Sequence, residues 1–313
     1  MMMWNNNNNN TLLLCLSVWT IVSWCITSSS AFVVLINRNT KYQEQQYEYE
    51  WKLNAISQQQ LGQFESLDGI SSSLDDDRLV QLIDLSSNVT SYHEVWDLQK
   101  EYHQQQLDQL QPKKQQQQQQ NYDEVRTKNQ DVLILTQHKP VYTLGTGSDP
   151  SFVRNNNNDE VEIVRIERGG EVTCHCPGQL VAYPILDLRR YKQDIHWYIR
   201  ALEEVIIIAL TNVGIEGAMR EDDVTGVWIQ NKKVAAIGVK ARRWVTMHGL
   251  AVNVETKSKP YFDGIVPCGL VGRDVGCIND FLDEPITLED FVPHLKSAMQ
   301  QVFQIKLQQQ QQQ

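Results

Sequence analysis

This sequence has few cysteines and carries a net negative charge. Six cysteines occur among 313 residues, and two of them, Cys15 and Cys25, belong to an apolar stretch near the N-terminus. The other four are too few for a disulfide scaffold in a chain of this length, so they favour a reducing compartment. The formal net charge of -10 argues against nucleic acid as a main partner, because phosphate binding requires a basic surface.

The apolar stretch Thr11–Ile26 has no lysine or arginine before it, so the usual positive flank of a signal peptide is missing. It is interrupted by serine and threonine and is short for a membrane-spanning helix. The small residues that follow predict cleavage after Ala31. We therefore expect residues 1–31 to be a signal-like targeting segment, with no stable membrane association after processing; a single-pass anchor is the alternative.

The junction Ser30-Ala31-Phe32 resembles the cleavage site of bipartite presequences in algae with complex plastids. Residues 32–78 are rich in glutamine, serine and acidic residues and lack periodicity, which is typical of a transit-like or disordered linker. Arg38 and Lys41 fit a transit peptide, whereas Glu44 does not. These features favour an organelle matrix, the plastid first and the mitochondrion as the alternative.

The chain contains homopolymer runs, which predict loops or tails where insertions cost little free energy. The runs are Asn5–Asn10, Gln115–Gln120, Asn155–Asn158 and Gln308–Gln313. We expect one folded domain over residues 79–306, with Gln- and Asn-rich loop insertions, followed by a disordered polyglutamine tail over residues 307–313.

Hydrophobic periodicity predicts both helices and strands in this domain. Helical spacing covers Ser91–Leu110 and Asp194–Asn212, and Thr287 is placed to cap a last helix that ends near Phe303. Strands or buried apolar runs are expected at Leu79–Leu85, Asp131–Thr136, Val161–Ile166, Leu180–Leu188, Val224–Ile229, Lys233–Val239 and Trp244–Val254. The expected fold class is α+β (mixed α/β), a mixed β-sheet flanked by helices.

The densest unusual stretch, Arg168–Gln179, contains three glycines, an arginine and a histidine. Glycines allow the backbone to approach a ligand and to offer N–H groups to an oxyanion. The simpler interpretation is a tight turn with a histidine bonded to backbone. Cys174-His175-Cys176 also suggests a metal site, but in an extended segment the two thiols face one side and the imidazole the other. We therefore expect no metal.

Two further residues suggest covalent chemistry. Lys233 opens an apolar strand, where burial would favour proton exchange near neutral pH; the alternative is that Lys232 and Lys233 are both exposed turn residues. Cys268 stands between a proline and a glycine, which leaves its thiol sterically open; the alternative is a small buried cysteine.

Taken together, these blocks resemble the lipoyl(octanoyl) transferase family. The resemblance extends from Leu79 to Phe303 and follows the family order. Its blocks are Ser91–Gln99, His138–Gly145, Arg168–Gln179, Lys233–Gly238, His248–Asn253 and Pro267–Gly269. Where the family commonly has an aromatic residue and a glycine, this chain has Cys174 and Cys176, so its acyl pocket is expected to differ from the family's in detail.

The resemblance implies a catalytic domain with the fold of biotin and lipoate ligases. It implies that Cys268 carries the acyl group as a thioester and that Lys233 lowers the pKa of its thiol. It also implies a substrate pocket formed by Arg168, Gly169, Gly170, Glu171, Val172, Thr173, Cys174, His175, Ala236, Ile237, Gly238, Gly249, Leu250 and Ala251.

By the same resemblance, the chain takes an octanoyl group from octanoyl-acyl carrier protein. The acceptors would be lysines of lipoyl domains in 2-oxoacid dehydrogenase complexes and in the glycine cleavage H protein. No cofactor and no ATP are expected, because a thioester is already activated. A cluster of Lys240, Arg242 and Arg243 could dock the acidic carrier, or could simply be a solvated charge run.

Three other functions remain open at this point. An ATP-dependent lipoate or biotin-type ligase would share the fold but would not need Cys268. A non-catalytic protein could bind acyl chains or lipoyl domains. A Cys–His hydrolase would depend on His175 or His248 lying beside a nucleophile.

Overall fold

The structure, a computed structural model, describes residues 78–110, 131–154, 161–221, 224–266 and 274–309. The expected targeting segment, the linker up to residue 77 and Cys268 lie outside these residues.

The strands are β1 (Leu79–Thr90), β2 (Asp131–His138), β3 (Val141–Leu144), β4 (Glu162–Arg165), β5 (Val172–His175), β6 (Gln179–Ile185), β7 (Val227–Ile229), β8 (Lys232–Arg242), β9 (Val245–Asn253), β10 (Asp274–Val275) and β11 (Lys306–Gln309). The α-helices are α3 (Tyr92–Gln109), α5 (Ile195–Asn212) and α6 (Leu288–Phe303). Short 3-10 helices are Pro150–Phe152, Leu188–Arg190, Thr256–Gly264 and Ile278–Asp280.

Most of the described strands form one mixed sheet in the order β10-β8-β9-β6-β2-β1-β11, with β7 also paired to β8. Strand β1 runs parallel to both β2 and β11, whereas β6 runs antiparallel to β2 and β9. A smaller sheet of order β4-β3-β5 lies beside it. This mixed pairing, flanked by helices, confirms the predicted fold class.

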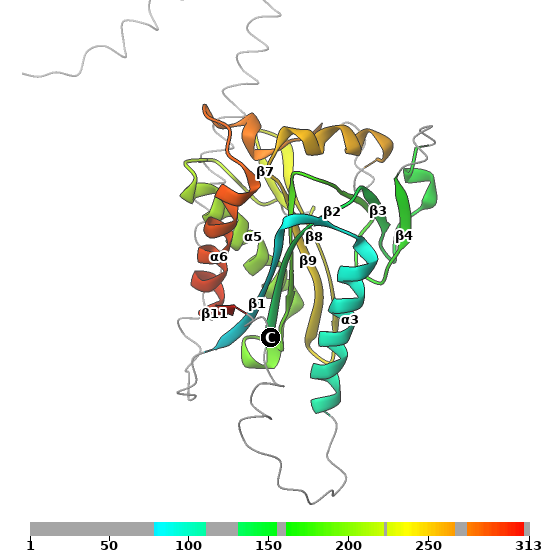
Figure 1. Cartoon of the computed structure of the whole chain (residues 1–313), viewed down its shortest axis with the longest axis vertical. Coiled ribbons are helices and arrows are strands. Elements are labelled where there is room, and N and C mark those ends of the chain that lie inside the picture. The colour runs from blue at the N-terminus through cyan, green and yellow to red at the C-terminus, as the bar shows by residue number, and fades with distance from the viewer. Residues whose placement is uncertain (1–77, 111–130, 155–160, 222–223, 267–273, 310–313) are drawn as a thin grey trace, which may run out of the picture. The chain divides into compact units, whose positions relative to one another are not determined.

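Helices α5 and α6 cover one face of the main sheet, and α3 covers the other (Figure 1). The larger core lies under α5 and α6, where Tyr198, Phe291 and Phe303 are fully buried. Asp194 accepts hydrogen bonds from the first turn of α5, and Thr287 forms a capping box with Asp290, as its predicted role requires.

Helix α3 attaches to the sheet partly through polar side chains. Gln99 accepts a hydrogen bond from the backbone N–H of His248 at 3.1 Å, and Gln106 donates to the carbonyl of Ile185 at 3.0 Å. Both glutamines are buried. These bonds attach α3 to the sheet, because one end of each buried amide finds a backbone partner.

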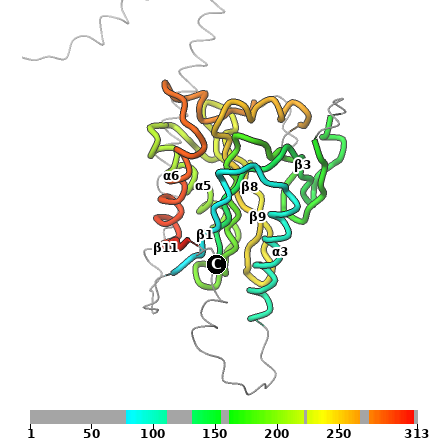
Figure 2. Tube along the Cα trace, viewed as in Figure 1, coloured from blue at the N-terminus to red at the C-terminus, as the bar shows by residue number. Residues whose placement is uncertain are grey.

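Two segments differ from the sequence expectation. Val172–His175, inside the expected glycine-rich turn, forms strand β5 against β3. The expected tail boundary at residue 307 falls inside β11, where Lys306–Gln309 pairs with the start of β1 (Figure 2). Local composition suggested a loop and a tail, whereas pairing with a distant strand decides both.

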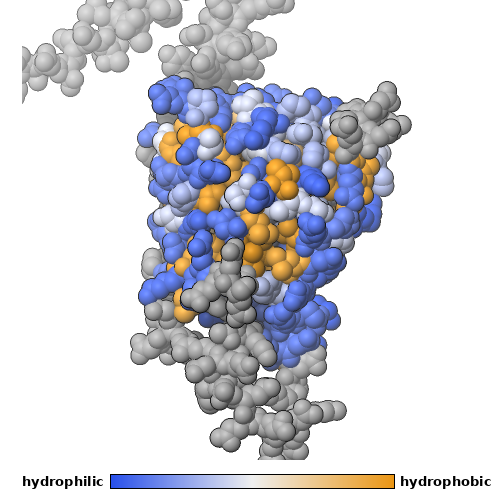
Figure 3. Space-filling model, in the orientation of Figure 1, coloured by the Kyte–Doolittle hydropathy of each residue, from blue (hydrophilic) through white to orange (hydrophobic). Residues whose placement is uncertain are grey.

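The face of the molecule seen in Figure 3 is hydrophilic with smaller apolar areas between. Among the described residues, none of the helices combines the length and apolar character needed to cross a bilayer.

Candidate active site

A cavity of about 540 Å³ lies along the central part of β8. Its walls come from β8, β9, the first turns of α5 and the segment Ile166–His175. The lining residues include Lys233, Ala236, Ile237, Gly238, Gly249, Leu250, Ala251, Arg168, Gly169, Gly170, Glu171, Val172, Thr173 and His175. The structure therefore brings together every predicted site residue that it describes, except Cys174.

Part of β8 is an open sheet edge at this point. Strands β7 and β10 pair only with Lys232–Ala235, so no other described strand covers Ala236–Val239 on the outer side. The carbonyl of Val239 faces that side, because it accepts a hydrogen bond from Gly169 N–H at 3.0 Å. Alternate residues of a strand direct their backbone groups to the same side, so Ile237 presents its N–H and C=O to the cavity.

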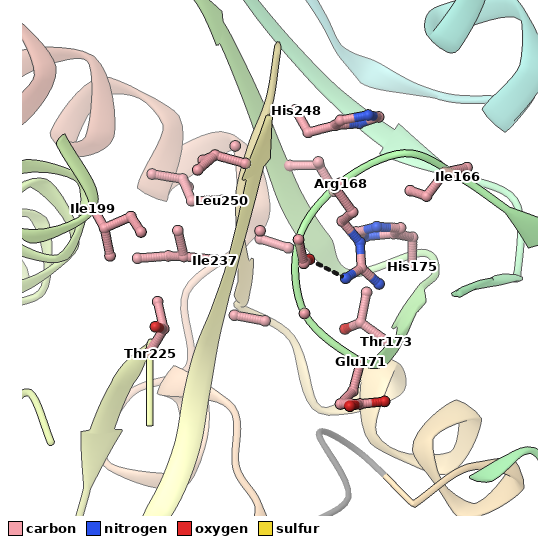
Figure 4. A pocket seen from close by; sticks show the side chains of 18 of the residues that line it. Ile166, Arg168, Glu171, Thr173, His175, Ile199, Thr225, Ile237, His248 and Leu250 are labelled. Atoms are coloured by element: carbon pink, nitrogen blue, oxygen red, sulfur yellow. Dashed lines mark hydrogen bonds between the residues drawn. The ribbon is translucent and has the colours of Figure 1, made fainter. Parts of the chain in front are cut away.

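The hydrogen bonds of the Arg168 side chain hold the glycine-rich segment over the open edge of β8. Its guanidinium donates to the carbonyl and hydroxyl oxygens of Thr143, at 2.8 and 3.1 Å, and to the carbonyl of Gly169 at 2.9 Å. The side chain is only 6% exposed. Figure 4 shows Arg168 and His175 on one side of β8 and Ile237 and Leu250 on the other. The cavity thus extends around the strand edge, polar on one side and apolar on the other.

Lys233 is buried, with 7% of its surface exposed. Its ammonium donates to the carbonyl of Thr225 at 2.8 Å and lies 5.4 Å from the ring centroid of Trp228. This burial contradicts the alternative in which Lys232 and Lys233 are both exposed turn residues. A lysine enclosed in this way is held in one position beside a bound group.

A buried carboxylate supports the segment that holds Lys233. Glu203, in α5, is fully buried and accepts a hydrogen bond from the N–H of Gly226 at 3.0 Å. It also forms ion pairs with Arg200 and Arg220. Glu203 therefore holds Gly226 in place, and with it the adjacent Thr225, whose carbonyl binds Lys233.

The two cavity histidines are neutral at physiological pH. Burial lowers the pKa of His175 to about 4, although its hydrogen bond with Gln179 at 2.8 Å partly offsets this effect. Burial and then the charge of Arg168 lower the pKa of His248 to about 3. A general base with so low a pKa works poorly near pH 7, which argues against a Cys–His hydrolase.

Cys174 and Cys176 lie away from the cavity. Strand β5 alternates, so His175 and Thr173 face the cavity while both thiols pack in an apolar cluster with Tyr142. Burial raises the pKa of the Cys174 thiol. Cys174 is therefore not a lining residue, and the prediction that the two thiols face opposite to His175 is confirmed. Among the described residues, no cluster of three potential metal ligands forms.

The basic cluster lies far from the lysine. Arg242 follows Lys233 by nine residues on the same strand, which corresponds to about 30 Å. Lys240 forms an ion pair with Glu167 at 3.4 Å. Lys240, however, directly follows Val239, which lines the cavity, so the docking role of this cluster stays a prediction.

The site thus combines a buried lysine, an open edge of β8 over Ala236–Val239 and an apolar cavity wall, an arrangement suited to an enzyme that binds an acyl group. Residues 111–300 match the lipoyl protein ligase A/B catalytic domain. An octanoyltransferase of Nostoc sp. is 51% identical over 179 residues, which is 57% of this chain and 80% of that protein. The octanoyltransferase LIP2p2, chloroplastic, of Arabidopsis thaliana is 50% identical over 161 residues, 50% of this chain and 57% of that protein.

Solved structures agree on the fold. A bipartite lipoate protein ligase of Thermoplasma acidophilum superimposes with a TM-score of 0.53 at 16% identity, covering 75% of this chain and 87% of that one. Lipoate-protein ligase A bound with ATP gives a TM-score of 0.52 at 16% identity, covering 75% and 88%. The chain belongs to the lipoyl protein ligase A/B catalytic domain family and, within it, to the octanoyltransferases. The predicted family and enzyme class, an acyltransferase, are confirmed.

Sequence reasoning did not select several residues of the site. Ile195 and Ile199 line the cavity from α5, and Tyr92 lines it from α3. Glu203 was unremarkable as a charged residue in a helix, although its place on the apolar face of α5 was an available signal. Thr225 acts through its carbonyl group, which no sequence pattern reveals.

Proposed function

We propose that this chain transfers an octanoyl group from octanoyl-acyl carrier protein to a lysine of lipoyl domains. The acceptors would belong to 2-oxoacid dehydrogenase complexes and to the glycine cleavage H protein. The observation that carries the proposal is Lys233, buried inside the cavity, held by Thr225 and followed along β8 by the open edge Ala236–Val239. Two octanoyltransferases that share about half of their aligned residues with this chain support the proposal.

The proposed chemistry has two steps. The Cys268 thiolate, which the Lys233 ammonium would stabilise, attacks the thioester carbonyl of the donor. A new carbon–sulfur bond forms, the old one breaks, and the carrier's thiolate leaves and takes up a proton. The acceptor amine then attacks the acyl-enzyme, loses its proton and forms an amide as the Cys268 thiolate departs.

Backbone groups would stabilise the tetrahedral intermediates of both steps. The N–H of Ile237 faces the cavity from the open edge of β8, so a backbone donor is available to a bound substrate. Because this donor belongs to a strand paired with β9 along its other side, it is held in place before the substrate binds.

A covalent adduct tests the proposal. The full chain, incubated with octanoyl-acyl carrier protein without ATP, is expected to gain the mass of one octanoyl group. Hydroxylamine should remove that mass, because it cleaves thioesters, and the Cys268→Ala variant should never acquire it. The measurement is intact-protein mass spectrometry, with Cys277→Ala as the matched thiol control, since burial raises the pKa of the Cys277 thiol.

Two outcomes would redirect the assignment. Transfer to a lipoyl domain that requires ATP and free octanoate would point to a ligase. Octanoyl binding without any transfer by a folded sample would point to a non-catalytic acyl-binding protein.

We also propose that residues 1–31 direct the chain to the secretory route and residues 32–78 direct it onward to the plastid matrix. The chloroplastic relative in Arabidopsis thaliana supports this address. A fluorescent protein fused to residues 1–80 should accumulate in plastids and lose its first 31 residues at the Ala31–Phe32 bond. Mitochondrial fluorescence would contradict the plastid assignment, and N-terminal sequencing would locate the cleavage site.

A further inference from the structure

One wall of the cavity is built from buried side chains with polar ends. Tyr92, Tyr183 and His248 line it, and they are 2%, 3% and 1% exposed. We call these three residues the polar wall. The ring centroids of Tyr183 and His248 are 6.4 Å apart, and Tyr92 stacks on His175 at 6.0 Å with an interplanar angle of 10°.

Two atoms of the polar wall lack a hydrogen-bond partner. They are the hydroxyl of Tyr92 and Nε2 of His248. By contrast, the hydroxyl of Tyr183 is bonded to Nε2 of His138 at 2.9 Å. Buried polar atoms without a protein partner in a cavity are normally satisfied by ordered water or by a ligand.

The polar wall is uncharged. Burial lowers the pKa of His248 to about 3 and raises the pKa of the Tyr92 phenol far above neutrality. The open hydrogen-bonding positions of the polar wall can bind water molecules.

The lysine and the polar wall are separated along β8. A side-chain carbon built on Gly226 would lie 2.6 Å from both Cε of Lys233 and the carbonyl oxygen of Ala235, so the lysine side chain reaches the level of Ala235. His248 pairs with Val239. The four residues from Ala235 to Val239 span about 13 Å. In Figure 4, Thr225 and His248 accordingly lie at opposite ends of the strand segment.

This separation can be compared with an acyl chain. Three backbone bonds of an extended polypeptide span about 3.6 Å, so a saturated chain gains about 1.2 Å per bond. An octanoyl group, with seven carbon–carbon bonds, then reaches about 8 Å, and a dodecanoyl group reaches about 13 Å. The shorter chain ends before the polar wall, and the longer chain meets it.

We propose that the polar wall limits the length of the acyl group that this enzyme accepts. Water bound to Tyr92 and His248 remains in place beside the end of an octanoyl chain. A longer chain displaces that water and leaves both atoms buried against methylene groups without partners. This inference rests on the proposed function, because it takes Lys233 to mark the reacting end of the substrate.

A competition between two donors tests the inference. The full chain receives equal concentrations of octanoyl- and dodecanoyl-acyl carrier protein with a lipoyl-domain acceptor, and mass spectrometry measures both products. The Tyr92→Phe variant keeps the stacked ring and removes only the unpartnered hydroxyl. We expect it to raise the dodecanoyl-to-octanoyl product ratio about tenfold, since burying an unsatisfied group is costly.

Tyr183→Phe is the matched control. It makes the same chemical change in the same wall but removes a hydroxyl that already has a partner, so the ratio should not rise. A ratio within twofold of the wild type in Tyr92→Phe would overturn the inference. So would a selective loss of octanoyl transfer in that variant, because it would place the hydroxyl at the reacting end. Absence of octanoyl transfer by the wild-type chain would instead reject the proposed function.

Discussion

Lys233→Met is expected to lower the rate of octanoyl transfer about a thousandfold, within the range that a positioned acid–base group contributes. Methionine has a similar length and can occupy the same buried space, but it offers neither the charge that stabilises a thiolate nor a proton to exchange. The loss should appear in single-turnover acylation of the enzyme, measured by rapid quench with octanoyl-acyl carrier protein.

Lys232→Met is the matched control for this prediction. Lys232 is adjacent and partly exposed, and it does not line the cavity. Its replacement should leave acylation within about threefold of the wild type, as expected for a surface substitution. Equal losses in both variants would show that general charge, and not the buried ammonium, is what matters.

Gly145→Ala is expected to have the second largest effect. A side-chain carbon at Gly145 would lie 2.1 Å from the carbonyl oxygen of Gly170, which is backbone and cannot move aside like a flexible side chain. The glycine-rich segment must therefore shift away from β8. We expect a loss of about 1–3 kcal/mol in the free energy of unfolding and a larger, at least tenfold, loss of transfer activity.

The control for Gly145→Ala stands two residues further along the chain. At Gly147, a side-chain carbon would meet no atom closer than 3.7 Å, so Gly147→Ala should be nearly neutral. Denaturant unfolding and the transfer assay, run on both variants, check the pair. If Gly145→Ala proves as active and stable as Gly147→Ala, the glycine-rich segment is not packed against β8 as the structure indicates.

Much of the fold could be predicted because the segments concerned carry a local signal. Helix α5 has a capping aspartate and a broad apolar face, and Thr287 begins a capping box, so both helices begin where the sequence places them. Strand β5 could not be predicted in this way. Its residues lie among glycines, and only pairing with β3 makes them extended.

The residues of the candidate site also differ in whether they carry a local sequence signal. Lys233 and Arg168–His175 could be selected because lysine in an apolar strand and a dense glycine segment are unusual. Thr225 and Tyr92 could not, since one acts through a backbone carbonyl and the other reads as an ordinary apolar position on a helix.

By itself, the sequence determined the family, the fold class and the types of side chain available for acyl transfer, because these depend on residue identity and order. Only the tertiary structure decided which of those side chains share a cavity. It buried Lys233 beside Thr225, turned Cys174 away from His175, and left the edge of β8 open beneath Arg168. Burial and hydrogen-bond partners come from segments far apart in the chain, so no local pattern specifies them.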